Sequence, residues 1–197
     1  YIVSVGRLTY AKGHWHLIRA FSIVNKRYPD LKLVIVGKEE ADQIKSTLDR
    51  IIRHFGLEDS ILFLGHLENP YPVINNAEVL ALSSIYEGLP GVVIESFACG
   101  TPVVASNNGG QKELLLQDKA SRVPAGPLSS FITSDRGCLA GYFDGTILDI
   151  EDLTFDEKQF AEALIYVLDG TIVKDDLLEY SKLFSLDSMI KRYNSLM

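Results

Sequence analysis

The sequence VLALSSIYEGLPGVVIESFACGTPVVAS, residues 79–106, contains two short apolar runs separated by a glycine- and proline-containing loop and an apolar segment. Residues 79–82 and 101–105 are continuous rather than alternating apolar runs, which favours strands buried on both faces. Residues 90–98 predict a helix that has Pro90 near its start and stops at Gly100. A strand–helix–strand unit of this kind is typical of a parallel sheet covered by helices.

The same alternation continues toward the N-terminus and just beyond residue 106. The segments predicted as strands are 1–5, 31–36 and 61–64, and those predicted as helices are 15–28, 44–55, 70–76 and 112–116. Right-handed crossovers between such strands give an α/β fold with a Rossmann-like, doubly wound parallel sheet. Ligands of this fold class bind at the carboxyl ends of the strands, so the loops that follow strands are the first candidates for a site.

The alternation breaks in residues 117–155, which are rich in glycine and proline. We predict an insertion or long loop there, with one short strand near 138–143. Helices are predicted again at 156–168, 174–184 and 186–197, so that residues 1–197 form one domain. The chain begins without methionine inside an apolar run, and we expect it to be part of a longer chain whose other domain precedes it.

Composition excludes several classes of protein. The 197 residues are 47% hydrophobic and 23% charged, with a net charge of −7, which excludes wholesale disorder and argues against broad nucleic-acid binding. Residues 1–110 carry ten basic and eleven acidic side chains, and residues 111–197 carry nine and fifteen. An anion site is therefore expected in the first part.

No apolar run is long enough to span a membrane, and the two cysteines do not form a metal-binding pair. Cys99 and Cys138 lie far apart and outside any C-x-x-C motif, so a zinc site or a disulfide framework is not expected. This pattern of cysteine use favours a cytoplasmic protein.

The first loop that could carry chemistry is GRLTYAKG, residues 6–13. Gly6 and Gly13 give its backbone freedom, and Arg7 and Lys12 place two cations before the N-terminus of a predicted helix. Backbone N–H groups and the helix dipole at such a position suit a phosphate or diphosphate, which Arg can clamp with two hydrogen bonds. The alternative, a solvated loop with two surface cations, is not excluded by the spacing, and the loop matches neither common nucleotide-binding glycine motif.

The second loop contains two carboxylates, Glu87 and Glu95, separated by seven residues. Glu87 follows a predicted strand, whereas Glu95 lies more than one turn into the next helix, within an otherwise apolar stretch. A carboxylate in apolar surroundings needs a partner, and a ribose diol is one candidate. The alternative is that Glu95 lies on the solvent-facing side of an amphipathic helix.

Together, these loops resemble a known family. The segments that carry the resemblance are 6–13, 33–37 (LVIVG), 63–65 (FLG), 87–106 and 109–114, in this order. They are similar to the C-terminal half of a retaining glycosyltransferase of family 4, which has the GT-B fold. The resemblance covers residues 1–116 well and resumes loosely in the C-terminal helices. The long segment after residue 116 departs from the family pattern.

The resemblance implies that this half binds a nucleotide-diphosphate sugar, such as a UDP- or GDP-sugar. It implies catalytic roles for three residues: Arg7 and Lys12 would hold the diphosphate and stabilise it as the leaving group, and Glu87 would lie at the donor sugar as nucleophile or orienting residue. Glu95 would bind the ribose hydroxyls. The donor-binding residues implied are Gly6, Arg7, Lys12, His66, Leu67, Glu87, Gly88, Leu89, Pro90, Gly91, Val92 and Glu95.

The resemblance further implies a sugar or lipid-linked acceptor bound by an N-terminal domain, a setting such as polysaccharide or lipopolysaccharide synthesis, and peripheral contact with the inner face of the membrane. No metal is required; residues 149–151 (DIE) resemble only a degenerate form of the D-x-D motif found in another class of glycosyltransferase. The alternative function is a non-catalytic nucleotide-sugar-binding or regulatory module.

Two histidines lie next to the first loop. His14 is a candidate for contact with a phosphate, whereas we expect His16 to be solvated or to cap the helix.

Overall fold

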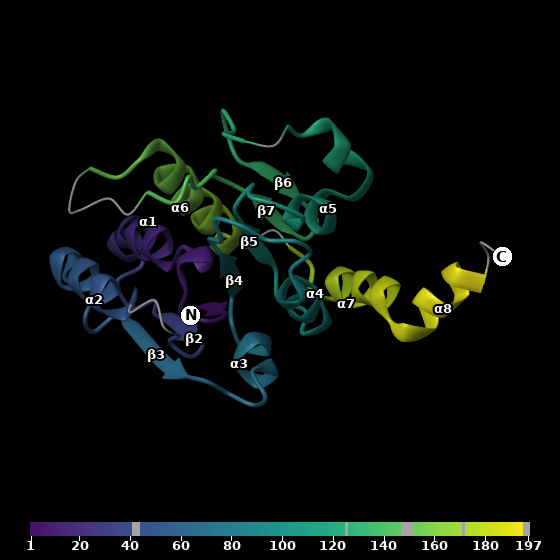
Figure 1. Ribbon diagram of the computed structural model, residues 1–197, viewed down its shortest axis with the longest axis horizontal. Coiled ribbons are helices and arrows are strands. Elements are labelled where there is room, and N and C mark those ends of the chain that lie inside the picture. The colour runs from purple at the N-terminus through teal and green to yellow at the C-terminus, as the bar shows by residue number, and fades with distance from the viewer. Residues whose placement is uncertain (41–43, 125, 147–151, 171, 195–197) are drawn as a thin grey trace.

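A computed structural model describes residues 1–40, 44–124, 126–146, 152–170 and 172–194. Its strands form one sheet in the order β3-β2-β1-β4-β5-β7-β6 (Figure 1). All neighbouring strands are parallel except β6, which runs antiparallel to β7. The strands are β1 (Ile2–Val5), β2 (Leu33–Val36), β3 (Ile61–Gly65), β4 (Val79–Leu82), β5 (Val103–Ala105), β6 (Ile132–Ser134) and β7 (Gly137–Leu139). The predicted doubly wound, Rossmann-like α/β fold is therefore confirmed.

Helices cover both faces of the sheet. They are α1 (His14–Arg27), α2 (Ile44–Phe55), α3 (Tyr71–Asn75), α4 (Gly91–Ala98), α5 (Gln111–Leu116), α6 (Phe155–Leu168), α7 (Lys174–Ser181) and α8 (Leu186–Asn194). Short 3-10 helices are η1 (Tyr10–Lys12), η2 (Gln117–Arg122) and η3 (Lys182–Phe184). In the part of the chain that the structure describes, no helix is both long and apolar enough to cross a membrane.

Two hydrophobic cores lie on opposite sides of the sheet. Successive residues of one strand belong to different cores: Leu33 and Ile35 pack with α1, α2 and α6, whereas Val34 and Val36 pack with α4, α5 and α7. Because successive strand side chains point to opposite faces, a strand buried on both faces must be apolar at every position. This explains why the strands were visible in the sequence as continuous apolar runs.

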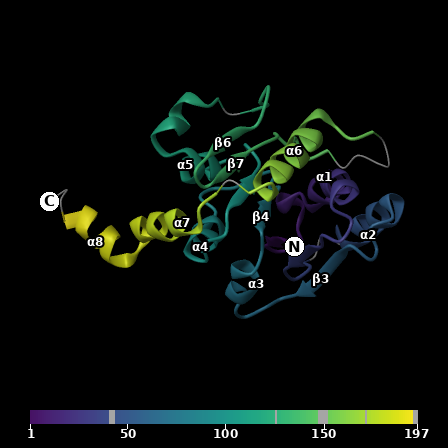
Figure 2. The same ribbon diagram turned by 180° about the vertical axis from the view of Figure 1, so that it is seen from behind.

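The segment after α5 contains more regular structure than predicted. Instead of one strand near 138–143, it contains η2 and the antiparallel pair β6–β7, and β7 is centred on Cys138. The strand β6 was missed because it is only three residues long and includes the polar residues Thr133 and Ser134. Figures 1 and 2 show that α7 lies beside α4 and that α8 extends beyond α7, away from the sheet on the side far from α2.

Gly37 allows the ends of three strands to meet. Its amide donates to the Gly65 carbonyl (2.8 Å), and a Cβ at this position would lie only 1.8 Å from the Gly6 carbonyl oxygen. We expect Gly37→Ala to lower the free energy of unfolding by about 2 to 3 kcal/mol, because the loop after β1 must move. Gly88→Ala is the matched control: no atom lies within 4 Å of its Cβ position, and we expect a change of no more than about 1 kcal/mol. Urea unfolding of both variants tests this, and equal effects would contradict it.

Candidate functional site

Three loops that follow β1, β4 and β5 are tied together at the carboxyl edge of the sheet. The Ser83 hydroxyl donates to the carbonyl oxygens of Lys12 and Gly13, at 3.1 Å each. The loop after β4 also forms a bridge from Glu87 to Gly109, and the Gly110 amide donates to the Gly88 carbonyl (2.9 Å). Residues far apart in the sequence are thereby held at one place.

Gly13 determines where α1 begins. Its φ of +57° is in the left-handed region, and a Cβ there would lie 2.4 Å from the Ser83 carbonyl oxygen. Only glycine adopts this conformation so close to another backbone without strain. The N-terminus of α1 is consequently fixed against the loop after β4.

Lys12 and Glu87 form an ion pair at the centre of these loops. The Lys12 ammonium contacts Glu87 Oε1, and the Ser84 hydroxyl donates to the same oxygen at 2.9 Å. The two side chains are 21% and 14% exposed, so the pair is shielded from bulk water but still open to a ligand. A partly desolvated charge interacts more strongly with a ligand's charge than a fully solvated one does.

Arg7 is turned away from this pair. Its guanidinium Nη1 lies 3.0 Å from both Glu40 carboxylate oxygens, and the two side chains are 69% and 43% exposed. Exposed ion pairs contribute little, so Arg7 can exchange Glu40 for an anionic ligand at small cost. The structure therefore does not bring Arg7 and Lys12 onto one group in its present arrangement.

A pocket of about 350 Å³ lies at the carboxyl ends of β1, β2 and β3. Arg7 and Glu40 border it, together with His66 and Leu67 from the loop after β3. Gly6 and Gly37, which have no side chains, also line it. Two of the implied donor-binding residues, His66 and Leu67, thus border one pocket with Arg7.

Glu95 lies on the second turn of α4 and is half-buried. Its Oε1 is 3.9 Å from the position that a Cβ of Gly91 would occupy, so the carboxylate lies beside the first turn of α4. Among the described residues, no group forms a hydrogen bond or ion pair with this carboxylate. No side chain caps the first turn of α4 after Pro90 either, which leaves both an acceptor and backbone donors available at this helix end.

Leu89 is 57% exposed and no atom lies within 4 Å of the Cβ position of Gly88, so this part of the loop before α4 is open to the outside. The residues predicted as a site therefore fall into two neighbouring groups. One surrounds Lys12 and Glu87 together with the start of α4, and the other lines the pocket beside Arg7.

The prediction for His16 was wrong. Its ring is 3% exposed, stacks on Phe143 at 4.3 Å, and its Nδ1 lies 2.9 Å from Glu157 Oε1. The loop 140–146 and α6 cover the ring, and their position could not be deduced from the sequence around His16. Arg19 and Glu157, both fully buried, belong to the same cluster and were not predicted. A T-x-x-E capping box at 154–157 was the available signal for Glu157.

His14 is also buried, at 2% exposure. Burial, together with the nearby charge of Lys12, lowers the pKa of His14 to about 4. The ring is therefore neutral at pH 7.

This buried histidine predicts a stability that depends on pH. Because the pKa of His14 in the unfolded chain is near 6.5, the unfolded state takes up a proton first as the pH falls. We expect about 3 kcal/mol of stability to be lost between pH 6.5 and pH 4 through this group. Proton NMR of the imidazole measures its pKa directly, and His14→Gln should flatten the pH dependence of urea unfolding in this range. A ring that titrates near pH 6.5 would contradict the prediction.

The D-x-D-like triplet at 149–151 lies outside the described residues. Within the described part of the chain, no group of three or more His, Cys, Asp or Glu side chains is arranged to hold a metal ion.

A parallel sheet with an ion pair, an uncapped helix end and a pocket at its strand ends defines the class of Rossmann-like ligand-binding domains. Residues 1–125 match the model of the family described as glycosyl transferases group 1, and the chain belongs to this family.

Individual relatives agree with this membership. An uncharacterized glycosyltransferase of Methanocaldococcus jannaschii is 29% identical over 98% of this chain and 48% of its own length. A Campylobacter jejuni enzyme, N-acetylgalactosamine-N,N'-diacetylbacillosaminyl-diphospho-undecaprenol 4-alpha-N-acetylgalactosaminyltransferase, is 39% identical over 60% of this chain and 31% of its own length. The chain thus spans at most about half the length of these relatives.

Solved structures share the fold. The crystal structure of Anabaena Alr3699/HepE in complex with UDP and glucose matches all of this chain and 48% of that one, with a TM-score of 0.70 and 20% identity.

Proposed function

We propose that this chain is the donor-binding domain of a retaining GT-B glycosyltransferase of family 4, which transfers a sugar from a nucleotide-diphosphate sugar to an acceptor. The observation that carries the proposal is the half-buried Lys12–Glu87 pair beside the uncapped N-terminus of α4. Family membership and the fold shared with a UDP- and glucose-bound structure support it.

In the proposed complex, the base occupies the pocket bordered by His66 and Leu67, and the ribose hydroxyls donate to Glu95. The diphosphate then extends toward Lys12, and Arg7 leaves Glu40 to reach it. The donor sugar lies over the segment 87–92, whose backbone amides contact its hydroxyls and the phosphate. This path places the negatively charged diphosphate beside two cations and the hydrogen-bond-donating ribose hydroxyls beside a carboxylate.

Departure of the diphosphate creates negative charge on the leaving group and positive charge on the sugar. The Lys12 ammonium, Arg7 and the helix end stabilise the diphosphate, and Glu87 lies on the side of the electron-poor sugar. We propose that the acceptor hydroxyl attacks from the face the diphosphate leaves, which retains the anomeric configuration. The bond from the sugar to the phosphate oxygen breaks as the glycosidic bond forms, and the acceptor's proton passes to the departing diphosphate. No metal has a role in this scheme, since the two cations and the helix end supply the positive charge.

The rest of the enzyme is also part of the proposal. An N-terminal domain holds the acceptor, and the isolated chain 1–197 should bind nucleotide but transfer sugar poorly. A sugar or lipid-linked acceptor, met at the inner face of the membrane, is supported by the diphospho-undecaprenol in the name of the Campylobacter jejuni relative. The free thiols of Cys99 and Cys138 fit a cytoplasmic enzyme.

Calorimetric titration with UDP, GDP and ADP tests the binding part of the proposal. We expect one diphosphate to bind selectively, with the same affinity with and without Mg²⁺. Glu95→Gln should weaken binding about tenfold or more, because charged hydrogen bonds to the ribose are lost. Glu162→Gln, on the exposed face of α6, is the matched control and should leave binding unchanged. If both variants bound the diphosphate as tightly as the parent protein, Glu95 would not belong to the site.

A further inference from the structure

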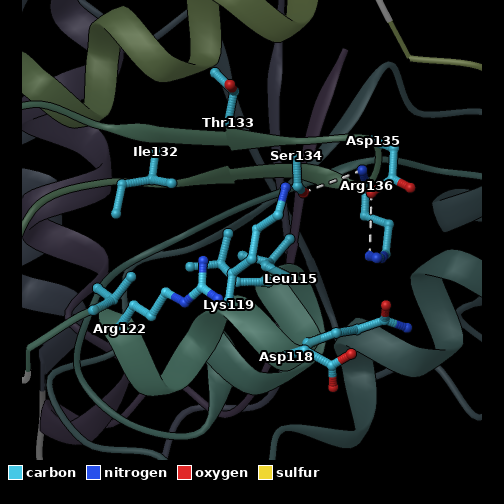
Figure 3. Close-up of a pocket in the computed structure, with 12 residues that line it drawn as sticks. Leu115, Asp118, Lys119, Arg122, Ile132, Thr133, Ser134, Asp135 and Arg136 are labelled. Atoms are coloured by element: carbon cyan, nitrogen blue, oxygen red, sulfur yellow. Dashed lines mark hydrogen bonds and ion pairs between the residues drawn. The ribbon is translucent and has the colours of Figure 1, made fainter.

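A second pocket lies between η2 and the β6–β7 hairpin, outside the proposed donor site (Figure 3). We name it the η2 pocket; its volume is about 520 Å³. It adjoins the C-terminal end of α5, whereas Gly110 and the donor loops adjoin the N-terminal end. No residue of the proposed donor site lines it.

The inner wall of the η2 pocket is apolar. Leu115 and Leu116 are 0% and 5% exposed, and half-buried Ile132 of β6 lies across from them. Leu115 and Leu116 are already shielded from water, so the apolar surface that a ligand could cover belongs to half-buried Ile132 and Val123, and covering it is favourable. The wall therefore suits an uncharged part of a ligand.

Two unpaired cations border the same pocket. Lys119 and Arg122 are exposed, and neither forms a hydrogen bond or ion pair with any described residue. Figure 3 shows both side chains reaching from η2 toward β6. Some surface cations elsewhere in this protein have partners, such as Arg27 with Asp169 and Lys182 with Glu179.

A third cation, Arg136, is buried at the far side of the pocket. Its side chain is 10% exposed, lies 4.1 Å over the Tyr180 ring, and has Nη1 3.1 Å from Asp135 Oδ1. Its Nε has no hydrogen-bond partner among the described residues. A guanidinium held this rigidly keeps a positive charge in place next to the pocket.

Acidic side chains do not cancel this charge at the η2 side. Asp135 is engaged by Arg136, and Figure 3 shows Asp118 on the opposite side of the pocket from Arg122. Residues 111–197 carry only nine cations against fifteen carboxylates, yet three of those cations line this one pocket.

Backbone strain occurs at the same place. Gln117, at the start of η2, has φ +49° and ψ −125°, and it is the one non-glycine residue with positive φ in the described chain. Such conformations cost about 1 to 3 kcal/mol and persist where the surroundings impose them. This conformation of Gln117 turns the chain from α5 into η2, and η2 carries Lys119 and Arg122 to the pocket.

We propose that the η2 pocket binds a small organic phosphate. The phosphate lies between the Arg122 guanidinium and the Lys119 ammonium, which provide two charges for a doubly charged group, and the uncharged body lies against Val123 and Ile132. The Arg fork matches phosphate oxygens with paired hydrogen bonds. This site is separate from the donor site and does not depend on the proposed function.

Phenyl phosphate is a suitable probe, because it combines a phosphate with an apolar ring. In ¹H–¹⁵N NMR titrations we expect it to shift the amides of 115–122 and 132–136 and to bind more tightly than inorganic phosphate or phenol. Arg122→Gln and Lys119→Gln should each weaken binding about tenfold. Lys26→Gln, which removes an exposed cation from α1, is the control and should change nothing.

Two results would overturn the proposal. One is an affinity that neither Arg122→Gln nor Lys119→Gln alters. The other is a set of shifts confined to residues 6–13, which would mean that the phosphate binds only at the donor loops. Lys12→Met distinguishes the two sites, since it should leave the shifts around η2 intact.

Discussion

Lys12→Met in the full-length enzyme is expected to lower kcat by about 10²- to 10³-fold, the usual cost of removing one group that stabilises charge in the transition state. Lys12 is the half-buried cation that contacts Glu87, so its charge acts in a partly desolvated site. The fold should survive, because Ser84 still donates to Glu87 after the substitution. Steady-state sugar transfer, measured together with nucleotide affinity, gives the result.

The controls for this experiment separate an enzyme from a binding module. Lys26→Met removes an exposed cation from α1 and should leave kcat unchanged. Glu87→Gln should lower turnover strongly while nucleotide affinity stays near that of the parent protein. If both Lys12→Met and Glu87→Gln changed only affinity, the non-catalytic alternative would replace the proposed transferase.

Glu157→Gln is expected to destabilise the protein by about 3 to 5 kcal/mol, because it leaves the buried charge of Arg19 without compensation. Arg19 Nε lies 2.8 Å from Glu157 Oε1, and both side chains are fully buried. Burial by itself raises the pKa of Glu157, but hydrogen bonds from His16 and Arg19 outweigh it and hold this pKa below its usual value. The carboxylate is therefore ionised in the folded state, and its stabilising contribution is lost only as the pH falls through the acid range.

Urea unfolding at pH 7 measures this effect. Glu162→Gln changes the same residue type on the exposed face of the same helix and should alter the free energy of unfolding by no more than about 0.5 kcal/mol. In Arg19→Met/Glu157→Leu both charges are removed, and we expect most of the lost stability to return. A loss below about 1 kcal/mol for Glu157→Gln would show that Arg19 finds another partner.

The sequence predicted the fold well because each central strand is buried on both faces. Residues 33–36 had to be apolar throughout, and the amphipathic segments between strands could then only be covering helices. Prediction failed where this requirement ended. The edge strand β6 has only three residues and partly exposed side chains, so its composition does not distinguish it from a loop.

The candidate site was predicted as a set of residues but not as an arrangement. Loop glycines, two cations and two carboxylates were visible, yet their spacing could not show that Lys12 would pair with Glu87 and Arg7 with Glu40. These pairs join residues 75 and 33 positions apart, so they depend on how the strand ends are brought together.

Local sequence thus determined the elements, because burial on two faces and glycine at tight turns are requirements of each segment by itself. Tertiary structure alone decided which charges meet. It buried His16 with Arg19 and Glu157 under α6, and it gathered Lys119, Arg122 and Arg136 around one pocket from two separate segments. The physical reason is that electrostatic contacts act between side chains that are close in space, whatever their distance along the chain.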